Sequence, residues 1–231
     1  MRYITKGNEP NIIATYRTIR QNAGQAITYE FFENKEQLND ILRSDQRNIC
    51  CYCMQSVDHF QGDNTAGSHN EHLVPQYGIN GNPTLQMDYS NIYACCNYTK
   101  GYPHSDAHCG EHKSDELIIN FIQQQNCRTF FKYNSIGEIL PAGNGSFETE
   151  AEFWQNVNHL PQGQQNALNT IKILNLNQPV LKKRRADLIQ QIFSLTRNFS
   201  QQQAQAKIQR MNNSNPLPPF VEVNIYYLNQ I

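Results

Sequence analysis

Apolar residues recur at helical spacing in three parts of the chain. NKEQLNDILRSDQ has its apolar residues on one helical face, and Asn34 can cap its start. SDELIINFIQQ shows the same pattern behind Ser114, with acidic residues in the first turn. Residues 148–211 continue it at length, with breaks near HLPQGQ and NLNQP. The pattern predicts two single helices followed by a long helical region.

Other stretches favour strands. CRTFFKYNSIGEILP predicts two strands around an Asn-Ser-Ile-Gly turn, and MRYI, AITYEFF and the tail after NPLPP carry strand-forming residues. In HNEHLVPQ, residues 69–76, a strand would end before the proline. Strand alternation would then place His69 and Glu71 on one face, and Asn70 and His72 on the other.

Residues 48–114 show little apolar periodicity, yet they hold six of the seven cysteines and six of the seven histidines. Such a segment cannot pack a core of its own and needs another organiser, for which a bound metal is the natural candidate. We therefore expect an α+β chain with three regions. A strand and helix region covers 1–47, a metal-organised module covers 48–126, and a mainly helical region for partner docking covers 127–231.

The composition limits the class of protein. The 231 residues, 39% of them apolar, suffice for one large domain. No apolar run approaches the length of a membrane span, and MRYITKGNEP lacks the apolar stretch of a signal peptide. We expect a cytoplasmic protein without membrane contact. In that compartment clustered cysteines are more typical of metal ligands or free thiols than of disulfides.

Charge is unevenly distributed. The net charge of −1 argues against a protein that coats nucleic acid non-specifically. Between residues 181 and 211, however, seven basic residues face a single acidic one, Asp187. This excess favours a local contact with phosphates or with an acidic partner, although a solvated helix face has the same composition. The residues expected at such a contact are Lys182, Lys183, Arg184 and Arg185, together with Lys113.

The cysteine spacing indicates a zinc site. Cys50 and Cys53 form a C-x-x-C pair, and zinc needs four tetrahedral ligands, so a second segment must supply another pair. Adjacent cysteines rarely chelate one ion, so this second pair is Cys95 or Cys96 together with Cys109. A structural zinc contributes on the order of 10 kcal/mol to folding in small modules. The alternative is a set of free, buried thiols.

Read in order, these motifs resemble those of the HNH endonucleases. The Glu-His pair of HNEHLVPQ resembles their first motif, Asn91 in YSNIYACC the central asparagine, and Cys109 to Lys113 the third element at a helix start. The resemblance implies a ββα-metal (HNH, or His-Me finger) module with a four-cysteine zinc, embedded in a mainly helical chain. It selects Cys96 over Cys95, which gives the structural zinc set Cys50, Cys53, Cys96 and Cys109.

The likeness extends over nearly the whole chain. MRYITKGNEP, LRSDQRNICCYC, HNEHLVPQ, HCGEHKSD and TIKILNLNQPVLKKRR look like the HNH nuclease subunit of Septu-type and retron-associated anti-phage systems. This implies a nuclease effector partnered by an ABC-type ATPase. In the retron-associated systems it further implies a reverse transcriptase with its RNA and DNA. The substrate implied is nucleic acid, either DNA or transfer RNA.

The family pattern assigns roles to individual residues. Phosphodiester hydrolysis needs an activated water and stabilisation of charge at the phosphate. The pattern makes His72 the general base and Glu71 a ligand of a catalytic Mg²⁺ or Mn²⁺, while Asn91 holds the loop that carries His72. His69 either binds the metal, contacts substrate or is structural.

The third element departs from the family. Many relatives have an Asn or His ligand directly after the last cysteine, where this chain has Gly110. Glu111, His112 and Asp115 are substitutes among which the sequence does not choose. CCNYTKG, with Asn97 and Lys100, also resembles the third element, but it leaves Cys109 unexplained.

Two other classes of function compete with a nuclease. A non-catalytic, zinc-organised adaptor would use the basic C-terminal helices to hold a partner, but the intact Glu71, His72 and Asn91 favour the enzyme. A thiol redox protein based on Cys50 and Cys53 lacks the surrounding βαβ pattern.

Overall fold

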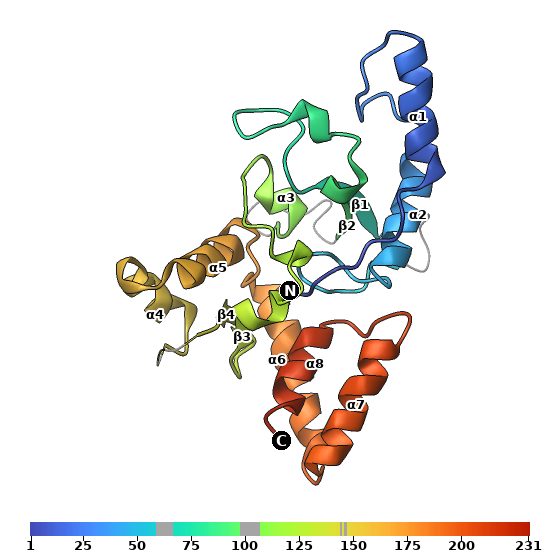
Figure 1. Cartoon of the computed structure of the whole chain (residues 1–231). Helices are drawn as coiled ribbons and strands as arrows, with labels where there is room; N and C mark the ends of the chain where they lie inside the picture. The colour runs from blue at the N-terminus through green and yellow to red at the C-terminus, as the bar shows by residue number, and fades with distance from the viewer. Residues whose placement is uncertain (59–66, 98–106, 144, 146) are drawn as a thin grey trace.

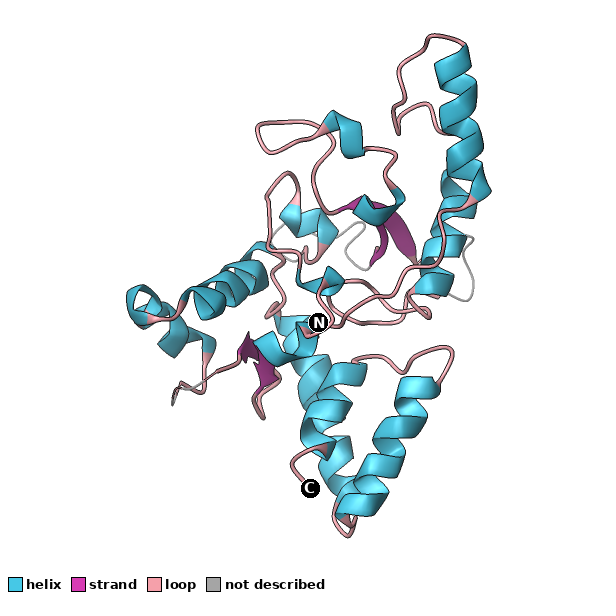
Figure 2. Ribbon diagram, viewed as in Figure 1, coloured by secondary structure: helices cyan, strands magenta, loops and turns pink. Residues whose placement is uncertain are grey.

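The computed structural model describes residues 1–58, 67–97, 107–143, 145 and 147–231. Helices dominate, and two small antiparallel sheets lie between them (Figures 1 and 2). Short 3-10 turns connect these elements at Pro83–Leu85, Tyr89–Asn91, Phe121–Gln123, Cys127–Phe130 and Val157–His159. No helix among the described residues is both long and apolar enough to cross a membrane.

The N-terminal region contains two helices. The predicted helix is confirmed as α2 (Lys35–Asp45), whereas α1 (Asn11–Asn22), which starts directly after Pro10, was not predicted. The strand expected over AITYEFF is wrong, because these residues form turns between the helices in which Phe32 is buried and Phe31 exposed. MRYI is also not a strand of either sheet; among the described residues, its backbone is bonded through the Ile4 N–H to the Ile122 carbonyl.

The first sheet pairs β1 (Ser68–His72) with β2 (Ile92–Cys96). Its register places His69 opposite Cys95 and His72 opposite Ile92. Helix α2 packs on the sheet, and its apolar residues share a buried cluster with Ile92 and Ala94. The short helix α3 (Gly110–Lys113) follows in the chain, which gives the order strand, strand, helix.

The helix predicted over SDELIINFIQQ is wrong. Ser114 has a left-handed φ of 48°, which ends α3 where the prediction starts a helix. The following residues are irregular, with Leu117 and Ile119 exposed, and only the turn at Phe121–Gln123 is helical. The next prediction is confirmed: β3 (Phe131–Tyr133) pairs with β4 (Ile139–Pro141) around the predicted turn.

The C-terminal region is helical, with the predicted breaks at HLPQGQ and NLNQP. Its helices are α4 (Glu150–Gln155), α5 (Gln162–Ile173), α6 (Pro179–Thr196), α7 (Gln201–Asn213) and α8 (Val221–Leu228). The strand predicted for the tail is wrong, since these residues form α8. Tyr226 apart, every residue of α8 is buried, so the helix shows no apolar period that could distinguish it from a strand.

One large core cluster joins all three regions of the chain. It runs from Met1 through Cys50 and Phe121 to Leu228. The segment before α8 also bonds directly to the stretch around the C-x-x-C pair. The Leu217 N–H donates to the Arg47 carbonyl at 3.0 Å, and the Phe220 N–H donates to the Met54 carbonyl at 2.8 Å. The C-terminal helices therefore complete the packing around the cysteines.

Candidate metal and catalytic site

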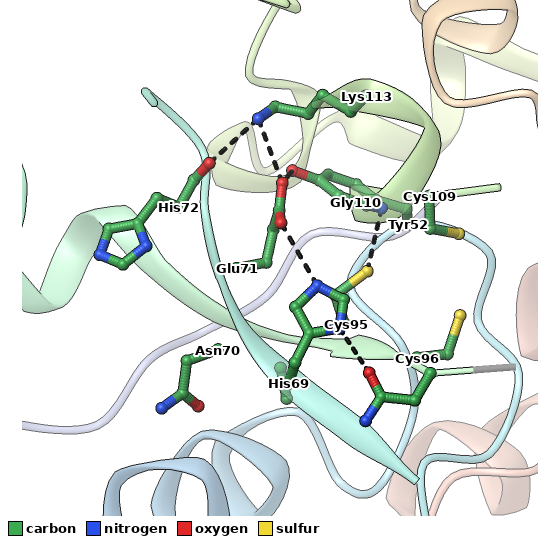
Figure 3. Close-up of polar contacts among 12 residues, drawn as sticks. Tyr52, His69, Asn70, Glu71, His72, Cys95, Cys96, Cys109, Gly110 and Lys113 are labelled. Atoms are coloured by element: carbon green, nitrogen blue, oxygen red, sulfur yellow. Dashed lines mark hydrogen bonds and ion pairs between the residues drawn. The ribbon is translucent and has the colours of Figure 1, made fainter. Parts of the chain in front are cut away.

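The two faces of β1 carry different chemistry (Figure 3). His69 and Glu71 lie on the face toward α3: His69 Nε2 is 3.5 Å from Glu71 Oε2, and Glu71 Oε1 is 3.1 Å from Lys113 Nζ of α3. Asn70 and His72 point the other way, toward Tyr29. The Asn70 amide donates to the Tyr29 hydroxyl at 2.7 Å, and the His72 ring meets the Tyr29 ring edge-on with centroids 4.7 Å apart. The alternation expected from the sequence is confirmed.

Glu71 is buried (8% exposed) and surrounded by polar partners. Its Oε1 lies 3.1 Å from Lys113 Nζ and accepts a hydrogen bond from the Tyr52 hydroxyl at 3.2 Å. Lys113 Nζ also donates to the His72 carbonyl oxygen at 3.1 Å. Lys113 is only 1% exposed, so it is not available for the contact with nucleic acid or a partner that the sequence predicted. Its ammonium group forms an ion pair with the Glu71 carboxylate instead.

Gly110 allows the close approach between α3 and β1. A Cβ atom at this position would lie 2.4 Å from Glu71 Oε2 and 2.9 Å from His69 Nε2, so a side chain would displace the pair. The position at which the HNH pattern has Asn or His is therefore occupied here by Gly110, which lies against Glu71 and His69. The Gly110 N–H donates to Cys95 Sγ at 3.2 Å.

Two of the other predicted metal ligands have contacts in other parts of the chain. His112 Nδ1 lies 2.8 Å from the Ile173 carbonyl in α5, and the backbone carbonyl of Asp115 accepts from the Asn80 amide at 3.0 Å. Glu111 lies half-buried in α3. The structure thus brings Glu71 and His69 together.

Asn97 is a residue of this site to which the sequence reasoning gave less weight. Its Oδ1 lies 2.6 Å from His69 Nδ1, so it orients the imidazole from the side opposite Glu71. The signal was its place directly after Cys96 in CCNYTKG. Lys100 of the same motif lies outside the described residues.

His72 is almost fully enclosed (6% exposed). Its Nε2 lies 2.9 Å from the Gln86 carbonyl, which can only accept, so Nε2 carries the proton and Nδ1 has the lone pair. The Gln76 amide lies 3.1 Å from Nδ1 and donates to it. Burial lowers the pKa of His72, which favours the neutral imidazole that a base requires. Sequence reasoning missed both glutamines.

Asn91 holds the chain directly after His72. Its Oδ1 accepts from the Val74 N–H at 2.9 Å, and its Nδ2 donates to the carbonyls of Val74 and Leu85 at 3.1 and 3.2 Å. This is the contact that the sequence predicted for Asn91. Its effect on catalysis stays a prediction.

The four cysteines predicted as zinc ligands lie together in the core, with Cys95 and His108 beside them. The Sγ atoms of Cys53 and Cys96 are 3.6 Å apart, and those of Cys50 and Cys109 are 3.9 Å apart. Zinc with four thiolates at 2.3 Å has sulfur–sulfur edges of roughly 3.8 Å. These two distances fit zinc. The predicted set does not form one group, however, because Cys50 and Cys53 belong to two overlapping groups of ligand atoms that each lie within 4.8 Å of one another. Cys51 and Cys127 are buried but belong to neither of the metal-competent groups of ligand atoms.

The KKRR segment is not a continuous basic surface. Arg185 is buried (2% exposed) and donates to the Gly137 and Leu176 carbonyls at 2.6 and 2.7 Å, so its expected role as a contact residue is wrong. Lys182 lies 3.6 Å from Glu138, and Arg184 bonds to the Gln55 side chain. Lys183 is exposed, 2.8 Å from Asp187. Arg185 therefore anchors α6, whereas Lys183 and Arg184 are exposed, and their contact with nucleic acid or a partner stays a prediction.

Comparison with known proteins adds one relative. No protein-family model matches the chain. A protein of Vibrio cholerae serotype O1 biovar El Tor, named "Retron Vc95 putative HNH endonuclease", is 26% identical over 197 residues, which cover 82% of this chain and 82% of the relative. This likeness supports a place in the HNH family, because it extends over most of both chains.

Proposed function

We propose that this protein is a metal-dependent HNH endonuclease that hydrolyses phosphodiester bonds as the nuclease effector of an anti-phage defence complex. One observation carries the proposal: Glu71 and His72, adjacent at the end of β1, are fixed by Lys113 of α3 and by the loop that Asn91 holds. A ββα-metal module would combine β1, β2 and α3 in this way. The named function of the Vibrio cholerae relative supports the same reading.

Glu71 and His69 fit a divalent cation. Their oxygen and nitrogen atoms face each other at 3.5 Å, and Gly110 leaves no side chain between them. Mg²⁺ and Mn²⁺ are commonly held by one or two carboxylates, with water and substrate phosphate in the remaining positions. A bound ion would stabilise charge on the phosphate and on the leaving oxygen.

The protein's own groups supply the proton transfer. The Gln86 carbonyl fixes the His72 tautomer, so Nδ1 is the atom that takes the proton of the attacking water. Gln76 occupies Nδ1 in this structure and must yield to that water. Lys113 and Tyr52 orient the Glu71 carboxylate, and Asn91 keeps the loop after His72 in place.

The cysteine cluster supports the catalytic residues through zinc, to which Cys50, Cys53, Cys96 and Cys109 all contribute. Tyr52 lies inside the C-x-x-C pair and contacts Glu71, while Gly110 follows Cys109 directly. A structural ion here would thus hold both elements that flank the carboxylate.

The partners proposed are an ABC-type ATPase and, in a retron setting, a reverse transcriptase with its RNA and DNA. The retron in the relative's name supports the second of these. The substrate is DNA or transfer RNA. A non-catalytic adaptor is the second candidate, favoured by the contacts that occupy His72 Nδ1 and Glu71.

The deciding experiment measures cleavage of duplex DNA and of transfer RNA with Mg²⁺ or Mn²⁺, with and without the ATPase. The wild-type chain should cut at least one substrate, and His72→Ala should not. The matched control is His159→Ala, which removes an exposed histidine of the C-terminal region. Equal activity of wild type and His72→Ala, or no cleavage under any condition, would leave the adaptor as the better account.

A further inference from the structure

Six buried ligand atoms gather in the cysteine cluster, which is more than one zinc ion can use. They form two groups of four, each with all its atoms within 4.8 Å of one another. The first group is Cys50, Cys95, Cys96 and Cys109. The second group is Cys53, Cys96, His108 and Cys109. Cys96 and Cys109 belong to both.

Distances in both groups suit tetrahedral zinc. In the first, Cys50 Sγ lies 3.9 Å from Cys95 Sγ and 3.9 Å from Cys109 Sγ. In the second, His108 Nδ1 lies 3.2 Å from Cys109 Sγ and 3.8 Å from Cys96 Sγ. Tetrahedral zinc has edges of roughly 3.8 Å between sulfurs and roughly 3.6 Å between sulfur and nitrogen.

A single ion leaves part of this arrangement unexplained. Neither group contains both Cys50 and Cys53, although a C-x-x-C pair chelating one ion would bring them together. An ion held by Cys50, Cys53, Cys96 and Cys109 would also leave Cys95 and His108 as buried ligand atoms beside it. Thiolate sulfur has enough lone pairs to bridge two ions. Two ions that share Cys96 and Cys109 would therefore use all six buried ligand atoms.

We propose that the cluster binds two zinc ions bridged by the thiolates of Cys96 and Cys109. Cys50 and Cys95 complete the first ion's shell, and Cys53 and His108 complete the second. Each ion then takes one pair of adjacent residues, an arrangement that the spacing argument for the sequence had set aside. Every ligand atom of both groups is then used, and each ion is four-coordinate and closed, as structural zinc sites are. The proposal concerns the scaffold and holds whether or not the chain cuts nucleic acid.

The surroundings suit the charge of such a cluster. Two zinc ions and five thiolates leave one net negative charge. N–H donors already face the terminal sulfurs: Cys96 N–H to Cys50 at 3.4 Å, Gly110 N–H to Cys95 at 3.2 Å, and the Gln55 amide to Cys53 at 3.7 Å. Arg184 bonds to Gln55, which adds positive charge to the outer side of the second group.

The test counts metal in the purified full-length protein. Elemental analysis and native mass spectrometry of the wild type should give about two zinc ions per chain, as two closed structural sites require. Cys95→Ser and His108→Ala each remove a terminal ligand from a different site, so each should lower the content to about one. Cys51→Ser and Cys127→Ser, buried thiols outside both groups, should keep the wild-type content.

Cadmium substitution gives an independent readout on the unaltered sequence, so the test does not depend on the folding of variants. Two bridged sites should give two cadmium resonances that couple to each other through the shared sulfurs. One zinc per wild-type chain, or a single cadmium resonance, would overturn the proposal. So would full metal content in both Cys95→Ser and His108→Ala. None of these results bears on nuclease activity, which the cleavage assay decides separately.

Discussion

Lys113 Nζ lies 3.1 Å from the Glu71 carboxylate in a buried contact that joins α3 to β1. The same ammonium group donates to the backbone carbonyl of His72, so one side chain contacts both residues proposed for catalysis. The pair is not exposed to competing solvent, because Lys113 is buried along its whole length. Removal of either charge would therefore leave the other without compensation.

Lys113→Met should destabilise the protein by roughly 3–5 kcal/mol, the usual cost of breaking a buried ion pair from one side. Denaturant unfolding measures this loss. Addition of Mn²⁺ should recover part of it, because a cation at Glu71 replaces the missing charge. The control is Lys183→Met, which breaks an exposed pair with Asp187 and should cost less than about 1 kcal/mol. Equal costs for the two variants would contradict the role given to Lys113.

His72→Ala and Glu71→Gln should differ in their response to metal. Loss of a positioned base lowers cleavage by roughly 100-fold or more, and no metal concentration should restore it. Glu71→Gln weakens the ligand of the catalytic metal, so excess Mg²⁺ or Mn²⁺ should recover part of the activity. Initial cleavage rates across a metal titration distinguish them. Rescue of His72→Ala by metal would assign that residue to metal binding, and zinc content should stay unchanged in both.

Asn91→Ala should lower the cleavage rate less than His72→Ala, since it removes orientation and leaves the base in place. The variant leaves the Val74 and Leu85 backbone groups without their partner, at a cost of roughly 1–3 kcal/mol. Asn91→Asp keeps the acceptor for the Val74 N–H but places a buried carboxylate oxygen opposite the carbonyls of Val74 and Leu85, so it should cost more than Asn91→Ala. Cleavage rates and unfolding free energies should follow the same order. If Asn91→Ala were as stable as the wild type, the hydrogen bonds of Asn91 would not be what holds the loop after His72.

Tyr52→Phe should raise the Mg²⁺ or Mn²⁺ concentration needed for half-maximal cleavage by about 10-fold or more, the usual effect of losing a hydrogen bond to a metal ligand. The hydroxyl contacts Glu71 and no ligand of the cysteine cluster, so zinc content should not change. Tyr226→Phe, a partly buried tyrosine on α8, is the control. An unchanged metal requirement in Tyr52→Phe would contradict the role of Glu71 as a metal ligand oriented by Tyr52.

The site was more predictable than the helices around it. Spacing alone located the cysteines and the alternation of His69, Glu71 and His72, because ligand geometry and the strand period act over a few residues. It did not identify Cys95 and His108 as cluster members, since their approach depends on how β2 and α3 pack. The burial of Lys113 and Arg185 was equally hidden: a basic residue in a sequence looks the same whether its partner is water, Glu71 or a carbonyl.

The errors in secondary structure have a common cause. AITYEFF and the tail contain residues that favour strands, but neither pairs with a strand of the two small sheets, and tertiary packing decided their conformation. SDELIINFIQQ has a helical period, yet no helix starts at Ser114. This residue is the C-cap of α3, and its positive φ of 48° turns the chain away from a helical path. Separate regions were expected on either side of residue 126, whereas one core cluster includes residues from both.

The bond between Phe220 and Met54 also has a consequence for the order of synthesis. A ribosome makes the C-x-x-C pair about 170 residues before it makes Phe220, which at about 5 to 20 residues per second takes roughly 10 to 30 s. During that interval the nascent chain has the first cysteines but not the helix that covers them. The packing around the cysteines is therefore completed late, only after α8 has been translated.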